Sequence, residues 1–247
     1  MKVLAIDIGG NSVKVLVTGK TDPRKFPSGP TLTPRQMVSG VLKLTEDWNY
    51  DAVSIGFPGR VRGNSPVSEP VNLGHGWVNF DFGKAFGVPV KVMNDAAMQA
   101  LGSYRGGKML FLGLGTGLGT AMVVDGTVVP MELGHLSYKQ GTYEDYLGLK
   151  GLKRLGIRKW RDCFMSVVTR FIAALEIDDV VIGGGNVNKL DTLPRGCRAG
   201  DNALAFRGGF LLWEKDGLRK VCTRPKSPSR SSQTKKSAMT TKKSERR

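Results

Sequence analysis

The sequence predicts an α/β protein built from two related halves. An apolar, β-branched strand, the turn Gly9-Gly10 and a second strand fill residues 2–17. The same order of strand, glycine-rich loop and strand returns at 109–124 around the loop 113–119. A supersecondary unit that occurs twice in one chain indicates an internal duplication. We therefore expect two α/β domains of similar construction.

Strand and helix patterns alternate along the rest of the chain. Thr33 is a suitable N-cap, and Pro34 a suitable first residue, for a helix that reaches Trp48. Asp125-Gly126 favours a tight turn between two strands. The other expected elements are strands at 52–57, 88–93, 127–129 and 179–182 and helices at 96–104, 160–175 and 202–213.

The chain divides into three parts. We expect an N-terminal domain at 1–97, a C-terminal domain at 98–217 and a tail at 218–247. The helix at 202–213 is a candidate to pack back on the first domain. The tail is rich in Ser, Thr, Lys and Arg and nearly free of apolar residues, so it cannot offset the entropy of ordering. It is expected to be disordered.

The net charge of +16 is concentrated in two places. Residues 219–247 hold eleven Lys and Arg and one Glu, which gives +10 and leaves +6 for the rest. The stretch 150–161 contains no acid and carries the bases Lys150, Lys153, Arg154, Arg158, Lys159 and Arg161. The tail is open to three interpretations: a tether for nucleic acid, a tether for polyphosphate, or a solubilising extension.

Membrane spans and disulfides are not expected. No apolar run reaches the roughly 18 residues of a membrane span, and the first residues lead straight into a strand pattern. We expect a cytoplasmic protein without membrane contact. Cys163, Cys197 and Cys222 lie far apart and form no C-x-x-C pair, so neither a disulfide framework nor a zinc site is predicted.

The first glycine turn is suited to a phosphate group and its metal. Asp7 follows a buried strand, the backbone N–H groups of Gly9, Gly10 and Asn11 can face phosphate oxygens, and Lys14 adds a positive charge. An ordinary hairpin turn with a capping Asp explains the segment equally well when it is taken alone. The second loop decides between these interpretations.

The second glycine-rich loop favours phosphate binding at both places. Its central residues are Gly115, Thr116 and Gly117, and strand patterns flank it. It lacks the Gly-Lys-Ser/Thr ending of a Walker A loop, and its position between two strands argues against a dinucleotide-binding loop. Two such loops can hold a phosphate chain from opposite sides of a cleft.

This pattern resembles the phosphate loops of the superfamily of actin, hexokinase and heat-shock protein 70, and more closely those of the ROK group of repressors, open reading frames and sugar kinases. Three further segments resemble ROK motifs: 56–61 its G-x-P-G-x-V turn, 72–77 its Asn…Trp segment and 92–96 its N-D-A segment. The resemblance covers the chain up to about residue 213. It implies an actin-like ATPase (ribonuclease H-like) fold, with two α/β domains flanking a cleft.

The N-D-A segment implies the catalytic base. In ROK kinases its Asp takes the proton of the sugar 6-hydroxyl and its Asn binds neighbouring hydroxyls, which implies these roles for Asp95 and Asn94. The chemistry agrees, because a carboxylate near the transferred phosphoryl group can orient the attacking hydroxyl and accept its proton. Asp95 also stands where a strand pattern gives way to a helix pattern, and capping that helix is a compatible role.

Further sugar contacts are implied by the same resemblance. Glu132 and His135 match the family's E-x-G-H, whose Glu and His contact the sugar. A cysteine-rich zinc knuckle follows in the wider family, whereas 137–146 contains no Cys, so no zinc is expected. Glu144 falls where the family carries a further sugar-binding Glu.

The zinc-free segment, followed by a helix rich in Trp, Lys and Arg, resembles the polyphosphate glucokinase branch. Those kinases use inorganic polyphosphate, often alongside ATP, as the phosphoryl donor. The bases at 150–161 suit this donor, because a polyanion binds a row of Lys and Arg through counterion release. A solvated basic helix face is the other interpretation. Gly184 and Gly185 resemble the superfamily's adenosine-side turn, which keeps ATP as a donor.

The resemblance implies a homodimeric kinase that phosphorylates glucose at the 6-hydroxyl with polyphosphate and also ATP. Mg²⁺ would bind through water to Asp7. One alternative is a ROK glucokinase or hexokinase that uses only ATP. Another is a non-catalytic sugar-sensing or nucleic-acid-binding protein, in which nucleic acid would bind only through the basic tail. The intact Asp95 and both phosphate loops favour the enzyme.

Overall fold

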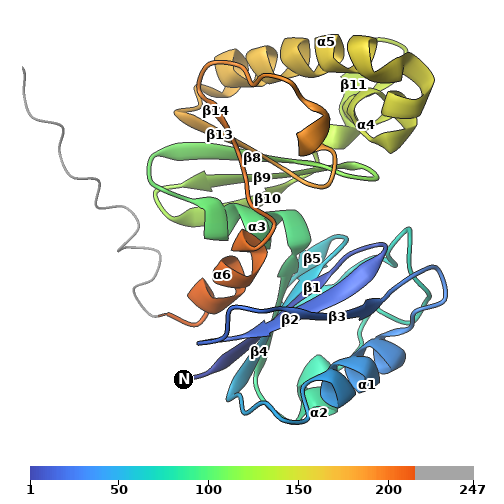
Figure 1. Ribbon diagram of the computed structural model, residues 1–247, viewed down its shortest axis with the longest axis vertical. Helices are drawn as coiled ribbons and strands as arrows, with labels where there is room; N and C mark the ends of the chain where they lie inside the picture. Colours follow the sequence, from blue (N-terminus) through green and yellow to red (C-terminus); the bar gives the residue numbers. More distant parts are fainter. Residues whose placement is uncertain (215–247) are drawn as a thin grey trace, which may run out of the picture.

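The computed structural model of the 247-residue chain describes residues 1–214 (Figure 1). Two five-stranded sheets lie one above the other, and helices α3 (Asp95–Ser103) and α6 (Leu204–Leu211) lie between them. The predictions for the tail at 218–247 and for Cys222 lie outside the described residues. Within residues 1–214, no helix is long and apolar enough to cross a membrane.

The first sheet contains the first predicted strand pair. Its strands are β1 (Val3–Ile8), β2 (Ser12–Val17), β3 (Arg24–Pro27), β4 (Ala52–Phe57) and β7 (Val90–Asn94), and α1 (Pro34–Leu44) and α2 (Phe82–Phe86) add to its core. The order is β3-β2-β1-β4-β7. Strands β1, β4 and β7 are parallel, so their carboxyl ends share one edge. This edge brings Asp7, the end of β4 and Asp95 together.

The second sheet repeats this plan. It consists of β8 (Lys108–Leu114), β9 (Leu118–Val124), β10 (Thr127–Met131), β13 (Asp179–Gly183) and β14 (Cys197–Ala199), in the order β10-β9-β8-β13-β14. In both sheets an antiparallel meander of three strands is extended by parallel strands. The tips of the β1/β2 and β8/β9 hairpins lie on the same side of the molecule, at the right of Figure 1. The predicted duplication is therefore present in the architecture.

Helices α3 and α6 connect the two sheets through glycine contacts. A Cβ atom on Gly102 would lie 1.8 Å from the Leu204 carbonyl oxygen, and one on Gly208 would lie 1.8 Å from the Met98 carbonyl oxygen. On the side of the first sheet, the Ser54 hydroxyl donates to the Gly209 carbonyl oxygen at 2.6 Å. Helix α3 spans the boundary proposed between residues 97 and 98, and α6 contacts β1 and β4.

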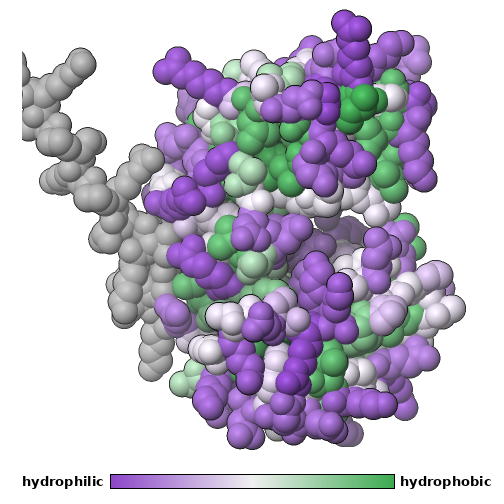
Figure 2. All heavy atoms as spheres, in the orientation of Figure 1, coloured by the Kyte–Doolittle hydropathy of each residue, from purple (hydrophilic) through white to green (hydrophobic). Residues whose placement is uncertain are grey.

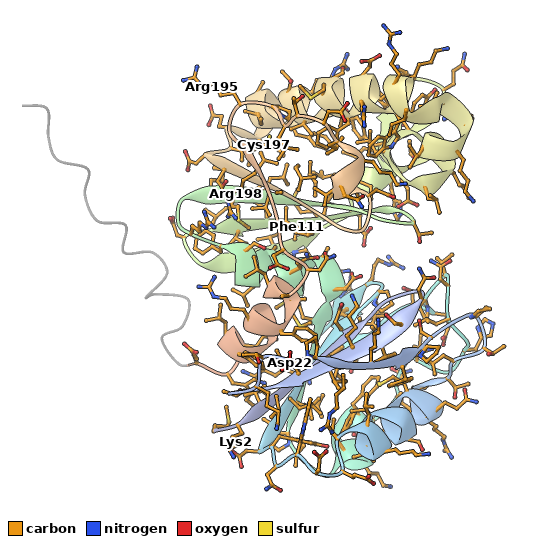
Figure 3. All side chains as sticks on the ribbon, in the orientation of Figure 1. Lys2, Asp22, Phe111, Arg195, Cys197 and Arg198 are labelled. Atoms are coloured by element: carbon orange, nitrogen blue, oxygen red, sulfur yellow. The ribbon has the colours of Figure 1, made fainter. Side chains whose placement is uncertain are left out.

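Arg198 fixes the far edge of the second sheet to α3. Its guanidinium donates to both carboxylate oxygens of Asp179 and to the Ser103 carbonyl oxygen, the last at 2.6 Å (Figure 3). Phe111, near the middle of β8, is buried against α3. Both faces of the second sheet are therefore covered, by α3 on one side and by α5 (Leu149–Leu175) on the other.

Two helices differ from their predicted bounds by more than two residues. Helix α1 ends at Leu44 instead of Trp48, because Trp48 turns inward and packs beneath the Arg24 guanidinium at 4.2 Å. Helix α5 begins at Leu149, well before the predicted start at residue 160. Its first part contains few buried apolar side chains, and Gly156 at φ 74° interrupts the helical geometry. This break interrupts the helical spacing of apolar residues, so the sequence pattern does not indicate a helix before residue 160.

Several short elements were not predicted, because each is too short for a periodic pattern. Two of them, the β11/β12 hairpin and α4, precede the basic helix and support the site. The unpredicted elements are β5 (Val61–Arg62), β6 (Ser65–Pro66), the 3₁₀ turns η1 (Leu133–His135) and η2 (Val187–Lys189), β11 (Ser137–Tyr138), β12 (Gly141–Thr142) and α4 (Tyr143–Leu147). The strand β14, the edge strand β3 and the helix α2 were not predicted either.

Candidate active site

Asn94 and Asp95 stand at the junction of β7 and α3. Asn94 caps the helix: its side-chain oxygen accepts from the Ala97 N–H at 3.0 Å, and its side-chain nitrogen donates to the Gly59 carbonyl oxygen at 3.1 Å. The Asp95 carboxylate accepts from the Ala96 N–H at 2.8 Å. The amide of Asn94 therefore belongs to the scaffold of the site and has one N–H and one oxygen lone pair left for a ligand.

The Asp95 carboxyl group has a strongly perturbed pKa. Burial, followed by the negative charges of Asp7 and Glu132, raises the pKa of Asp95 from 3.8 to about 7. The two neighbouring carboxylates reach it from the β1/β2 hairpin and from the end of β10, so the two halves of the chain meet at this group. A carboxyl group with a pKa near neutrality is suited to accept a proton at physiological pH.

The first glycine turn presents backbone N–H groups beside Asp7. The Gly9 N–H donates to the Ser12 carbonyl oxygen, and Ser28 supports the turn, since its hydroxyl donates to the Gly9 carbonyl oxygen at 2.6 Å. The N–H groups of Gly10 and Asn11 have no partner among the described residues. Burial raises the pKa of Asp7, and Lys14, with its ammonium 3.9 Å away, opposes that rise.

Backbone hydrogen bonds close the second glycine loop, and two of its N–H groups have no partner among the described residues. The Gly115 N–H donates to the Gly117 carbonyl oxygen at 3.1 Å, and the Leu149 N–H donates to the Thr116 carbonyl oxygen at 3.1 Å. The N–H groups of Thr116 and Gly117 have no partner in the part of the chain that the structure describes. Two successive unpaired N–H groups form a site for an anion. The amino end of α5 is attached directly to this site.

Glu144 lies at the second glycine loop. One of its carboxylate oxygens accepts from the Leu118 N–H at 2.9 Å, and a Cβ atom on Gly117 would lie 2.3 Å from that oxygen. Glu144 stands in the first turn of α4, which the capping box of Thr142 and Asp145 begins. The residue predicted as a sugar contact is thus also bound to the loop predicted to hold donor phosphates.

Glu132 and His135 frame η1 at the rim of the site. The two side chains are 3.8 Å apart, and 47% and 67% of them, respectively, are exposed. Glu132 is close enough to Asp95 to raise its pKa, whereas His135 is open to solvent. Figure 2 shows a recess between the two halves at the right of the view, where the β1/β2 and β8/β9 hairpin tips lie in Figure 1, with hydrophilic residues along its edge.

The turn after β13 reaches the second glycine loop through a residue that the sequence analysis did not select. Gly184 has φ 85°, and a Cβ atom there would lie 2.4 Å from the Leu114 carbonyl oxygen. The next polar side chain, Asn186, is 8% exposed and donates to the Gly115 carbonyl oxygen at 3.0 Å. The sequence feature that could have identified Asn186 is its position as a polar residue directly after a glycine turn. Gly185 remains exposed beside this contact.

The basic residues at 150–161 differ in whether other residues of the protein bind them. Arg161 donates to the Lys189 carbonyl oxygen at 2.7 Å and forms an ion pair with Asp191, so its charge is neutralised. Arg154 donates to the Asp145 carbonyl oxygen at 2.9 Å. The remaining bases are exposed and have no ion pair among the described residues: Lys150, Lys153, Arg158 and Lys159.

Aromatic packing stabilises the segment 137–146, in which the cysteines of the wider family's zinc knuckle are missing. Tyr138 stacks on Tyr143 with ring centroids 4.9 Å apart, and Tyr146 meets Tyr138 edge-on at 5.1 Å. Tyr143 also packs against Phe171 of α5 at 4.8 Å. Within residues 1–214, no group of three His, Cys, Asp or Glu side chains is placed to hold a metal ion by itself.

The comparison with protein families identifies the class of this protein. The model of the ROK family matches residues 3–142, more than half of the chain, and the chain belongs to the ROK family. The fold agrees. The structure is similar to the crystal structure of an inorganic polyphosphate/ATP-glucomannokinase from Arthrobacter sp. strain KM, with TM-score 0.73 and 21% identity. That match covers 89% of this chain and 98% of the other, and the actin-like ATPase fold is confirmed.

Two curated proteins are similar to this chain in sequence. The bifunctional enzyme NanE/NanK of Brucella melitensis is 30% identical over 141 residues, which cover 51% of this chain and only 27% of the relative. The polyphosphate glucokinase of Mycobacterium leprae is 26% identical over 209 residues, which cover 74% of this chain and 63% of the relative. The polyphosphate glucokinase branch is therefore represented among the relatives of this chain.

Proposed function

We propose that this protein transfers a phosphoryl group to the 6-hydroxyl of glucose, with Asp95 as the general base. The observation that carries the proposal is the half-buried Asp95 carboxyl group at the junction of β7 and α3, whose pKa burial and the charges of Asp7 and Glu132 raise to about 7. In the reaction, the sugar oxygen attacks the terminal phosphorus and the bond from that phosphorus to the donor's bridging oxygen breaks. The hydroxyl proton passes to the ionised Asp95.

The two glycine loops would bind the donor phosphates. The unpaired N–H groups of Gly10, Asn11, Thr116 and Gly117 support this, because phosphate oxygens can accept from all four. Asp7 fits a Mg²⁺ ion, since its carboxylate lies close enough to Asp95 for the two charges to interact, and among residues 1–214 only Lys14, at 3.9 Å, forms an ion pair with it. When bound through water to Asp7, Mg²⁺ would neutralise charge on the donor phosphates.

The sugar would be oriented by side chains from both halves. Asn94 retains hydrogen-bonding capacity after capping α3, and Glu132 lies close to Asp95. Glu144 has a second carboxylate oxygen beside the one bound to Leu118. His135 is exposed, so its contact with the sugar would form at the rim of the site. These four residues complete the proposed acceptor site.

Polyphosphate is the donor that the basic helix favours, with ATP as a second donor. The Leu149 N–H binds the second glycine loop, and α5 has no side-chain N-cap, so its positive end and its first bases continue directly from the phosphate site. A solvated helix face would require no such attachment. The turn at Gly184-Gly185, fixed by Asn186, supports a nucleotide on the other side of the loop.

The direct test is the formation of glucose 6-phosphate with polyphosphate and with ATP, measured in parallel for the parent and Asp95→Ala. We expect product from both donors with the parent and none with the variant. A matched control is Asp22→Asn, which removes an exposed carboxylate in the β2/β3 turn. Product from ATP alone would favour the strictly ATP-dependent glucokinase. No product from either donor would favour a non-catalytic sugar-sensing or nucleic-acid-binding protein.

A further inference from the structure

Three cations are arranged over two tyrosine rings beside the basic helix. The ammonium of Lys139 lies 5.2 Å from the Tyr138 ring and 5.3 Å from the Tyr146 ring. The guanidinium of Arg154 lies 4.7 Å from the Tyr146 ring, and that of Arg170 lies 5.9 Å from the Tyr138 ring. These five side chains form a continuous series, which we call the cation–tyrosine ladder. Two of its cations, Lys139 and Arg170, lie outside the basic stretch 150–161.

The charges of the ladder are available to an anion. None of the three cations forms an ion pair with a described residue. Asp145, an acid whose charge interacts with that of Arg154, directs its carboxylate into the helix cap, where it accepts from the Thr142 N–H at 3.0 Å and from the Thr142 hydroxyl at 2.7 Å. The Lys139 ammonium donates to the Cys163 sulfur at 3.6 Å and also interacts with the Tyr138 side chain, so at least one of its three N–H donors is left for an anion.

The tyrosine rings hold the cations in place before any ligand binds. Contact with an aromatic face stabilises a cation by about 0.5–1 kcal/mol at exposed sites. Tyr138 and Tyr146 are themselves buried, at 6% and 8% exposure, so the rings cannot move away. Long basic side chains normally lose rotamer freedom when they bind a ligand, and earlier ordering lowers this cost. The ladder is therefore better prepared for an anion than isolated surface lysines are.

The ladder begins next to the second glycine loop. Arg154 donates to the carbonyl oxygen of Asp145 in α4, while a Cβ atom on Gly148, which follows α4, would lie 2.9 Å from the Thr116 carbonyl oxygen. Only α4 and one glycine thus separate the first cation of the ladder from the loop. In the opposite direction the series ends at Arg170, beyond the Gly156 break in α5.

We propose that the cation–tyrosine ladder is a distal subsite for inorganic polyphosphate, which binds donor phosphates beyond those held by the glycine loops. This inference rests on the proposed phosphoryl transfer from polyphosphate and adds the path that a long donor follows. Each phosphate of the chain carries a negative charge, and its contact with a Lys or Arg releases counterions. Arg161 is not part of this path, because Asp191 already neutralises it.

The test compares long-chain polyphosphate with tripolyphosphate and ATP in the double variant Lys139→Ala/Arg170→Ala. We expect the KM for the long chain to rise about five- to tenfold, since each lost surface contact contributes modestly. The KM values for tripolyphosphate and ATP should stay within a factor of two, because short donors end near the glycine loops. The slope of log KM against log salt for the long chain should fall by roughly 1–2.

Two further variants separate charge from structure. Arg35→Ala/Lys43→Ala removes one Arg and one Lys from the exposed face of α1, and it should leave all three KM values unchanged. Lys139→Arg/Arg170→Lys keeps both charges and should retain tight binding of the long chain. Thermal unfolding of each variant checks that α4 and the hairpin before it remain folded.

The outcomes distinguish this inference from the proposed function. If the parent forms no glucose 6-phosphate with polyphosphate, the donor assignment itself is wrong. If the parent is active with polyphosphate but Lys139→Ala/Arg170→Ala has an unchanged KM for the long chain, the ladder is not a subsite. An equal rise in KM for long chain, tripolyphosphate and ATP would likewise overturn it, because that result indicates a disturbed glycine loop.

Discussion

Replacement of Asp95 by Asn should stabilise the protein in a way that depends on pH. The folded protein raises the pKa of Asp95 from 3.8 to about 7, so keeping this group ionised in the fold is costly. At about 1.4 kcal/mol per pKa unit, the rise corresponds to about 4 kcal/mol. Asn has no charge to bury, and its side-chain oxygen can still accept from the Ala96 N–H.

The direction of this pH dependence follows from how many protons Asp95 binds in the folded and in the unfolded protein. Below pH 3.8 both folded and unfolded Asp95 are protonated, and the ionisation cost is absent. Between pH 3.8 and about 7 the unfolded chain loses this proton first, so the stability of the parent falls as pH rises. Above about 7 the loss is complete. The stability advantage of Asp95→Asn should therefore grow from near zero at about pH 4 to about 4 kcal/mol at about pH 8.

Urea unfolding of parent and variant at a series of pH values measures this difference directly. The experiment is done without Mg²⁺, donor or sugar, since any ligand of the folded state would shift the stability of the parent. Asp22→Asn serves as the control, because its carboxylate is exposed and, within residues 1–214, only the Thr21 hydroxyl donates to it. A difference for Asp95→Asn that does not change with pH would refute the reasoning.

Three other predictions concern activity and folding. Because only ionised Asp95 accepts the proton, kcat/KM should rise about tenfold per pH unit below about 7 and level off above it; a flat profile would contradict this role. In Gly117→Ala the new methyl group would lie 2.3 Å from the Glu144 carboxylate, which the Leu118 N–H holds, so the KM for both donors should rise about tenfold in initial-rate assays. Gly83→Ala in α2 is the control, since its methyl group would meet Asp81 at an ordinary contact distance of 3.5 Å. In Gly208→Ala the methyl group would meet the Met98 carbonyl oxygen at 1.8 Å, and urea unfolding should show a loss of about 3 kcal/mol or more. A loss below about 1 kcal/mol would mean that α3 and α6 separate easily.

Local patterns were sufficient to predict the frame of the site. Gly9-Gly10 and the loop around Thr116 are joined to strands whose apolar alternation can be recognised without tertiary information. Asp95 lies at the start of α3, where a strand pattern gives way to a helix pattern. The sequence therefore predicted all strands of the two sheets except the edge strands β3 and β14, together with the two glycine loops and the place of Asp95 between a strand and a helix.

Contacts between distant segments could not be predicted in the same way. Asn186 became a candidate only when the structure placed its amide 3.0 Å from the Gly115 carbonyl oxygen. The neutralisation of Arg161 depends on Asp191, which no helical spacing relates to it. The attachment of Glu144 to Leu118 likewise requires α4 to fold back on the β8/β9 hairpin. Each of these features depends on the tertiary fold.

The start of α5 shows a different limit. Its first turns carry Lys150, Lys153 and Arg154 on the surface and contain Gly151 and Gly156, so apolar periodicity appears only from Trp160 onward. Attachment to the second glycine loop and packing against α4 make this part helical. Tertiary contacts override weak local propensity here.

The central claim is that Asp95 takes the proton of the sugar hydroxyl during phosphoryl transfer. The most direct measurement is kcat and the KM for glucose in the parent and in Asp95→Asn, with polyphosphate and with ATP at about pH 8, where the parent carboxylate is ionised. The account predicts that kcat falls by about 10²–10⁴ with both donors while the KM for glucose changes only a few-fold. A variant that keeps more than about a tenth of the parent kcat would contradict it.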